Sequence, residues 1–132
     1  MIVGSISENI QTEKRVAITP EVVKKYKSLG LEVHLEKNYA SHIGIEDEKY
    51  VIEGAKIFDT DDEIISNSDA IVQMNIISDK NLKMLTKDQI LIGVLNPYLN
   101  QEKLNKVNSK NINCFSLELL PRITRAQSMD IL

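Results

Sequence analysis

Short apolar segments alternate with helix-forming segments along almost the whole of this 132-residue chain, and this order constrains the fold more than any other feature. Neighbouring segments are separated by only a few polar residues. Parallel strands need a crossover between them, and a helix usually supplies it. The sequence therefore predicts an α/β domain with a doubly wound, mainly parallel sheet and helices on both faces, flavodoxin-like or Rossmann-like.

The expected strands cover residues 1–6, 31–35, 55–59, 70–74, 89–95 and 112–120. The expected helices cover residues 20–29, 46–53, 61–67, 78–85 and 101–110. The first helix has the strongest start signal, because Thr19 is a good N-cap and Pro20 suits the first helical position. In the second strand, LEVHL, apolar and polar residues alternate, so one face should be buried and His34 should be exposed or half-buried.

Composition excludes several classes of function. The net charge is −3, and 16 basic residues are scattered among 19 acidic ones, which is not the basic surface that nucleic acids need. One cysteine and two histidines make a metal site improbable, and Cys114 has no internal disulfide partner. No apolar run approaches the roughly 18 residues of a membrane span, and MIVG is unlike a signal peptide. We expect one cytoplasmic domain without a metal.

Ligands of such sheets bind beyond the carboxyl ends of the strands. In this chain those ends are residues 7–18, 38–45, 75–78, 96–100 and 121–130. The five glycines form neither G-x-G-x-x-G nor a P-loop, so the chain has no seat of its own for a pyrophosphate. Glu8 is the only acid close to the end of the first strand, which argues against a phospho-receiver.

The three arginines stand out because the other 13 basic residues are lysines. Arg15, Arg122 and Arg125 all fall in expected loops or element ends, where a planar bidentate donor can be required. The stretch PRITRAQSMD combines two arginines with an amide and a carboxylate directly after a strand, as a hydride-transfer site would need. The residues alone leave open a structural alternative, namely helix capping and a surface ion pair of Arg125.

A family resemblance covers essentially the whole chain. It rests on EKRVAITP at residues 13–20, on the following helix that ends at Leu29-Gly30, on LEVHLEKNYASHIGIEDEKYVIEGAKI, and on the tail PRITRAQSMDIL. These segments resemble the N-terminal domain shared by alanine dehydrogenases and the alpha subunit of proton-translocating nicotinamide nucleotide transhydrogenases. The tail is similar to the transhydrogenase version, which leads into a long helix and then a separate NAD-binding Rossmann domain.

Two departures favour the transhydrogenase branch. Alanine dehydrogenases carry a substrate-binding lysine within K-V-K-E-P, whereas residues 72–76 here are VQMNI. The catalytic histidine expected after the next strand has no counterpart in NPYLN at residues 96–100. Arg15 matches the arginine that holds the substrate carboxylate in alanine dehydrogenases.

The resemblance implies an N-terminal domain over residues 1–132, followed in a longer polypeptide by the Rossmann domain. It implies NAD(H) bound between the two domains and hydride passed directly to NADP(H) on a partner subunit, without a metal. A membrane subunit would couple this transfer to proton movement, and the parent protein would be a homodimer at the cytoplasmic side of the inner membrane.

The resemblance also implies roles for residues of the tail. Gln127 would hydrogen-bond the nicotinamide carboxamide, and Arg122 and Asp130 would form a polar pair that positions the ring; these three are the expected catalytic residues. Ser128 and Met129 would complete the cofactor-binding segment, with Arg15 and Arg125 as further candidates. Two alternatives stay open: an alanine dehydrogenase-type amino-acid oxidoreductase, and a non-catalytic scaffold domain of the same fold.

Overall fold

The computed structural model describes residues 1–75, 77–93, 102, 105 and 112–116. Its centre is a sheet of six strands, and every neighbouring pair is parallel. The strands are β1 (Ile2–Ser5), β2 (Glu32–Glu36), β3 (Lys56–Phe58), β4 (Ala70–Gln73), β5 (Ile90–Gly93) and β6 (Asn113–Ser116). Their order across the sheet is β3-β2-β1-β4-β5-β6.

This order confirms the predicted doubly wound sheet. Chain progression runs outward from β1 to β3 on one side and from β4 to β6 on the other, so the direction reverses between β1 and β4. Of the two predicted types, the structure has the Rossmann-like strand order and not the flavodoxin-like one. The crevice between β1 and β4 is therefore the place where this class of sheet accepts ligands.

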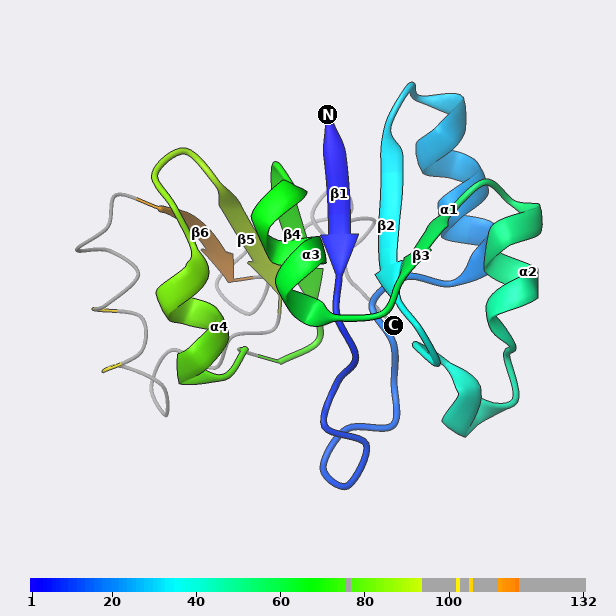
Figure 1. Cartoon of the computed structure of the whole chain (residues 1–132), viewed down its shortest axis with the longest axis horizontal. Helices are drawn as coiled ribbons and strands as arrows, with labels where there is room; N and C mark the ends of the chain where they lie inside the picture. The colour runs from blue at the N-terminus through cyan, green and yellow to red at the C-terminus, as the bar shows by residue number, and fades with distance from the viewer. Residues whose placement is uncertain (76, 94–101, 103–104, 106–111, 117–132) are drawn as a thin grey trace, which may run out of the picture.

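Helices cover both faces of the sheet (Figure 1). The described helices are α1 (Pro20–Ser28), the short 3₁₀ helix η1 (Ser41–Ile43), α2 (Asp47–Ile52), α3 (Asp61–Asn67) and α4 (Asp79–Met84). In Figure 1, α1 and α2 lie together beside β2 and β3, whereas α3 and α4 lie in front of the sheet. The helix expected over residues 101–110 falls mostly outside the described residues.

The predicted start of α1 is confirmed in detail. The Thr19 hydroxyl accepts a hydrogen bond from the Val22 backbone N–H at 3.3 Å, and Pro20 occupies the first turn. Gly30 then adopts a φ of +83°, a conformation that an L side chain rarely takes, just after the helix ends. Sequence signals at both ends thus fix the length of this helix.

The described residues form two apolar cores, one with α1 and α2 and one with α3 and α4. The first contains Val23 of α1 and Tyr50 of α2 packed with Leu35 of β2. The second contains Ile64 of α3 packed with Leu82 of α4 and with strand residues such as Ile71 and Leu91. Ser5 and Ile6, successive residues at the end of β1, face opposite sides of the sheet, so this strand contributes to both layers.

Gly4 in β1 allows α3 to approach the sheet closely. A Cβ atom on this residue would lie 2.0 Å from Ser68 Oγ and 2.8 Å from Ile64 Cγ2, both far inside van der Waals contact. Only glycine fits at this position without a shift of α3. The close approach holds the C-terminal end of α3 against the strand that leads into the β1–β4 crevice.

His34 corrects one expectation from the sequence. Its side chain is buried, not exposed or half-buried, and its ring packs on Phe58 with the ring centroids 4.7 Å apart. The reason is that β2 contacts α3 as well as α1, and Phe58 of β3 covers the His34 ring, so neither face of the strand is left to solvent. Alternation along LEVHL therefore does not mark a solvent-facing side here.

Within the described part of the chain, no helix is both long enough and apolar enough to cross a membrane.

Candidate functional site

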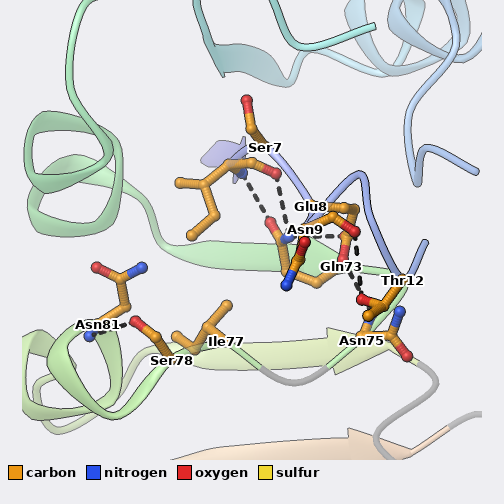
Figure 2. A pocket seen from close by; sticks show the side chains of 10 residues that line it. Ser7, Glu8, Asn9, Thr12, Gln73, Asn75, Ile77, Ser78 and Asn81 are labelled. Carbon is orange, nitrogen blue, oxygen red and sulfur yellow. Dashed lines mark hydrogen bonds between the residues drawn. The ribbon is translucent and has the colours of Figure 1, made fainter. Parts of the chain in front are cut away.

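A pocket of about 450 Å³ lies at the reversal point of the sheet, where β1 and β4 end. One wall is the loop after β1, with Ser7, Glu8, Asn9 and Thr12 (Figure 2). The opposite wall comes from the end of β4 and from α4, with Gln73, Asn75, Ser78 and Asn81. Ile6 and Ile77 supply apolar surface. Both walls include residues from carboxyl-end loops that the sequence singles out, residues 7–18 and 75–78.

Glu8, in the loop after β1, is hydrogen-bonded to residues at the end of β4 and so connects the two walls of the pocket. Its Oε2 accepts hydrogen bonds of 2.8 Å from Gln73 Nε2 and from the Met74 backbone N–H, and its Oε1 accepts a longer one of 3.3 Å from the Asn75 backbone N–H. Burial raises the pKa of the Glu8 carboxyl above its usual value, against the opposing effect of these donors, and the charge of Glu13 raises it further.

The fully buried side chain of Gln73 in β4 hydrogen-bonds the chain at the end of β1. Its Oε1 accepts from the Ile6 backbone N–H at 2.7 Å and from Ser5 Oγ at 3.0 Å, while its Nε2 donates to the Ile6 carbonyl and to Glu8. Ser5 Oγ is also 2.7 Å from the buried hydroxyl of Tyr39. A continuous set of hydrogen bonds thus links the pocket carboxylate to the interior of the sheet.

Arg15 is held beside the pocket and is not part of its lining. Its Nε and Nη2 donate to the two carboxylate oxygens of Glu13, each at 2.9 Å, so the pair is bidentate. Asn75 Nδ2 donates to the same carboxylate at 2.9 Å. These bonds, with the one from the Arg15 side chain first, lower the pKa of Glu13 to about 2.

The pocket lining is rich in amides and hydroxyls and poor in charge. Among the described residues that line it, Glu8 is the one ionisable side chain and none is basic. The described part of the chain also contains no group of three or more His, Cys, Asp or Glu side chains that could hold a metal ion. Such a surface can orient an uncharged polar group by hydrogen bonds, and it offers no counter-charge to a carboxylate.

Most of the site residues expected from the sequence lie outside the described residues: Arg122, Arg125, Gln127, Ser128, Met129 and Asp130. Arg15 is the one that can be placed, and it lies next to the pocket on Glu13. Glu8, Gln73, Asn75 and Asn81 are not among the site residues expected from the sequence. The signal that could have found Glu8, Gln73 and Asn75 is their position at or just after the ends of the two strands that flank the reversal point, and using it requires the strand order. Asn81 lies further along the chain, in α4.

The strand order and the position of the pocket define a Rossmann-like α/β domain with a ligand-sized crevice at its switch point. The chain belongs to the family "Alanine dehydrogenase/PNT, N-terminal domain", which matches it over residues 4–132.

Its relatives include subunits of NAD(P) transhydrogenase. It is 40% identical over 136 aligned residues to the first part of NAD(P) transhydrogenase subunit alpha of Rickettsia prowazekii, with all of this chain and 36% of the relative covered. It is 31% identical to NAD(P) transhydrogenase subunit alpha of Haemophilus influenzae, with all of this chain and 25% of that protein covered. The chain thus spans about a third or less of the length of these curated relatives.

Solved structures agree on the fold. The transhydrogenase of Sinorhizobium meliloti superposes with a TM-score of 0.89 at 33% identity, over 98% of this chain and 39% of that chain. An L-alanine dehydrogenase superposes with a TM-score of 0.82 at 21% identity, over 89% of this chain and 32% of that one. The expected family resemblance is therefore confirmed, and the chain is similar to one part of these proteins.

Proposed function

We propose that this chain is the N-terminal part of the NAD(H)-binding component of a proton-translocating NAD(P) transhydrogenase. The observation that carries the proposal is the 40% identity to a transhydrogenase alpha subunit over the full length of the chain. In this proposal a Rossmann domain follows in the same polypeptide, and NAD(H) binds between the two domains. Hydride then passes directly to NADP(H) on a partner subunit.

The chemistry of hydride transfer would belong to the two nicotinamide nucleotides, and the protein would orient them. Gln127 would hydrogen-bond the carboxamide, and Arg122 and Asp130 would position the ring and respond to its change of charge. Ser128 and Met129 would complete the binding segment, and Arg125 is a further candidate. The partners would be a membrane subunit that moves protons, an NADP-binding subunit and a second copy of this chain, at the cytoplasmic side of the inner membrane.

The alternative is an alanine dehydrogenase-type oxidoreductase, since such enzymes share this fold. The carboxyl end of β4 argues against it, because the residues there are the uncharged Gln73 and Asn75. Arg15 is already bound by Glu13, so the described pocket presents no free cation to an oxo-acid carboxylate. A scaffold domain without catalysis is the second alternative, and it predicts that substitutions in this domain leave hydride transfer from NADH unchanged.

Gln127→Asn in the assembled, full-length enzyme tests the proposal. The substitution keeps the amide but withdraws it by about 1.5 Å, more than a productive hydride geometry tolerates. Hydride transfer from NADH to an NADP analogue, followed by stopped flow, should fall about tenfold to a hundredfold, while NADH affinity changes much less.

An unchanged rate at saturating nucleotide, with an unchanged melting temperature, would remove Gln127 from the site. The same preparation should show no amination of pyruvate, and measurable amination would favour the alanine dehydrogenase alternative.

A further inference from the structure

The loop after β1, residues 7–14, projects beyond the end of that strand and is joined to other elements through ionisable side chains (Figure 1). Within the described part of the chain, the backbone–backbone hydrogen bonds of residues 8–14 stay inside the loop. The described hydrogen bonds that reach other elements use Glu8 and Glu13 of the loop, Glu36 at the end of β2, and His42 of η1. The attachment of this loop can therefore respond to pH.

Two carboxylates of the loop meet at Asn75, two residues after β4 ends. The Asn75 backbone N–H donates to Glu8 Oε1 at 3.3 Å, and its Nδ2 donates to Glu13 Oε1 at 2.9 Å. Arg15 donates to both oxygens of Glu13, whereas the described donors to Glu8 are uncharged N–H groups. Glu13 is thus held in its charged form, and Glu8 is the member of the pair that can take up a proton.

The attached loop can accommodate a proton on Glu8 at one particular atom. Oε2 accepts both short bonds of 2.8 Å, from Gln73 Nε2 and the Met74 N–H, while Oε1 accepts the long bond from Asn75 (Figure 2). A proton on Oε1 therefore costs at most the long bond and keeps both short ones. It also removes a half-buried negative charge that lies near the charge of Glu13.

We propose that Glu8 makes the attachment of the loop after β1 sensitive to protons: a proton on Oε1 tightens the contact with the end of β4, and ionisation of Glu8 loosens it. The inference does not depend on the proposed function. Burial raises the pKa of Glu8 above its ordinary value of 4.5 in the attached loop, and the Glu13 charge raises it further. The added stability is therefore complete below about pH 4.5 and is lost as the pH rises through the pKa of the attached form.

The other charged or titratable groups that face Glu8 keep one state over this range. The pKa of Glu13 is about 2, and its carboxylate raises the pKa of Arg15, so both stay charged. Burial raises the pKa of Tyr39, which stays neutral. The described residues of β4 and α4 that line the pocket beside Glu8 carry no charge. A pH response of the contact with β4 is therefore assigned to Glu8.

The test is hydrogen exchange at the backbone amides of Met74 and Asn75, which donate to Glu8, in the full-length protein. Protection is the unstructured exchange rate at each pH divided by the measured rate, and it reports local opening. It should rise about threefold or more in the wild type from about pH 8 to about pH 4.5. Glu8→Gln, neutral at every pH, should abolish the rise. Glu13→Gln should move it to lower pH, because it removes a charge that raises the pKa of Glu8.

Two matched controls address the other points where the loop is attached. His42 Nε2 lies 2.9 Å from the Lys14 carbonyl, and Glu36 Oε1 accepts from the Ser7 N–H at 2.9 Å. Imidazoles can change charge near neutral pH, so His42→Gln keeps a donor that does not titrate. Glu36→Gln likewise keeps an acceptor. Both variants should retain the rise in protection, and amides of β2 and β5 in the same samples report any change in global stability.

Protection at Met74 and Asn75 that is constant or decreases as the pH falls would overturn the inference, and this result needs no variant. So would a rise that persists in a Glu8→Gln protein that melts like the wild type, or a rise that His42→Gln or Glu36→Gln abolishes. If Glu8→Gln does not fold, the wild-type profile and its displacement in Glu13→Gln decide. The proposed function stands or falls separately, on NADH binding and hydride transfer.

Discussion

At the scale of single residues, Glu13 is the carboxylate beside the pocket whose pKa is strongly lowered by its neighbours. It receives two side-chain bonds from Arg15 and one from Asn75 while its own side chain is 10% exposed. These donors stabilise the charged form of Glu13 and so lower its pKa. The stability of the folded state therefore depends on whether Glu13 is ionised.

We expect Glu13→Gln to lower the free energy of unfolding by about 1 kcal/mol at pH 7, a modest value because Arg15 is half exposed. The folded-state pKa of about 2 lies below the ordinary value of 4.5. The contribution of Glu13 is therefore complete above about pH 4.5 and is lost as the pH falls toward 2. Urea unfolding at several pH values between about 7 and 2 should show that the free energies of unfolding of the wild type and of Glu13→Gln converge as the pH falls.

The exposed Glu48→Gln serves as the control and should show no such convergence. If the difference in the free energy of unfolding between the wild type and Glu13→Gln stayed constant down to about pH 2, the Glu13 carboxylate would not be bound as described.

At the scale of elements, β1 and β4 are joined by few backbone pairs, and side chains such as Ser5 and Gln73 add hydrogen bonds between them. Their register is defined by two residue pairs, Val3 with Ala70 and Gly4 with Ile71. Beyond these pairs, Gln73 extends the connection, because its amide bonds the backbone of Ile6 at both its N–H and its carbonyl. The buried amide thus continues the sheet where backbone pairing stops.

Gln73→Met keeps the approximate volume and removes these bonds. We expect a loss of about 2–3 kcal/mol in the free energy of unfolding, because two buried backbone groups of Ile6 lose their partner. Chemical denaturation measures it, with the exposed Gln11→Met as the control, for which a change within about 0.5 kcal/mol is expected. A Gln73→Met protein as stable as the wild type would show that water or a shifted backbone replaces the amide.

Elements are easier to predict than the site. Local signals such as Thr19-Pro20 and Gly30 act within a few residues, so the ends of α1 can be predicted from the sequence. The burial of His34 cannot, because it depends on β3 and α3 covering a face of β2 that alternation leaves undecided. The sequence narrows the strand order to two doubly wound types, flavodoxin-like and Rossmann-like, but it does not decide between them.

The sequence places the pocket only among several loops. Glu8 and Gln73 are 65 residues apart in the chain, and nothing in either segment alone indicates that they meet. Their contact follows from the pairing of β1 with β4, which is a property of the whole sheet. The roles expected for Gln127, Arg122 and Asp130 rest on the family resemblance and stay predictions.

At the scale of the whole molecule, the chain has a switch-point crevice but no glycine-rich turn to hold a pyrophosphate. We expect residues 1–132 alone to fold and to bind NADH only weakly, with a Kd of about a millimolar or worse. The longer protein should bind far more tightly. Fluorescence titration of NADH against both measures the difference, and circular dichroism of the short protein controls for folding. Micromolar binding by residues 1–132 would contradict the two-domain proposal.

The central position of β1 also has a consequence for how the protein is made. β1 needs β2 on one side and β4 on the other, yet β4 follows it by more than sixty residues. At about 5–20 residues per second, a ribosome completes β4 several seconds after β1. During that interval one edge of β1 is open to other strands, and the crevice between β1 and β4 does not yet exist. A molecule that bound in this crevice could therefore stabilise the domain only after β4 has paired, so it would act on the late steps of folding and not on the early ones.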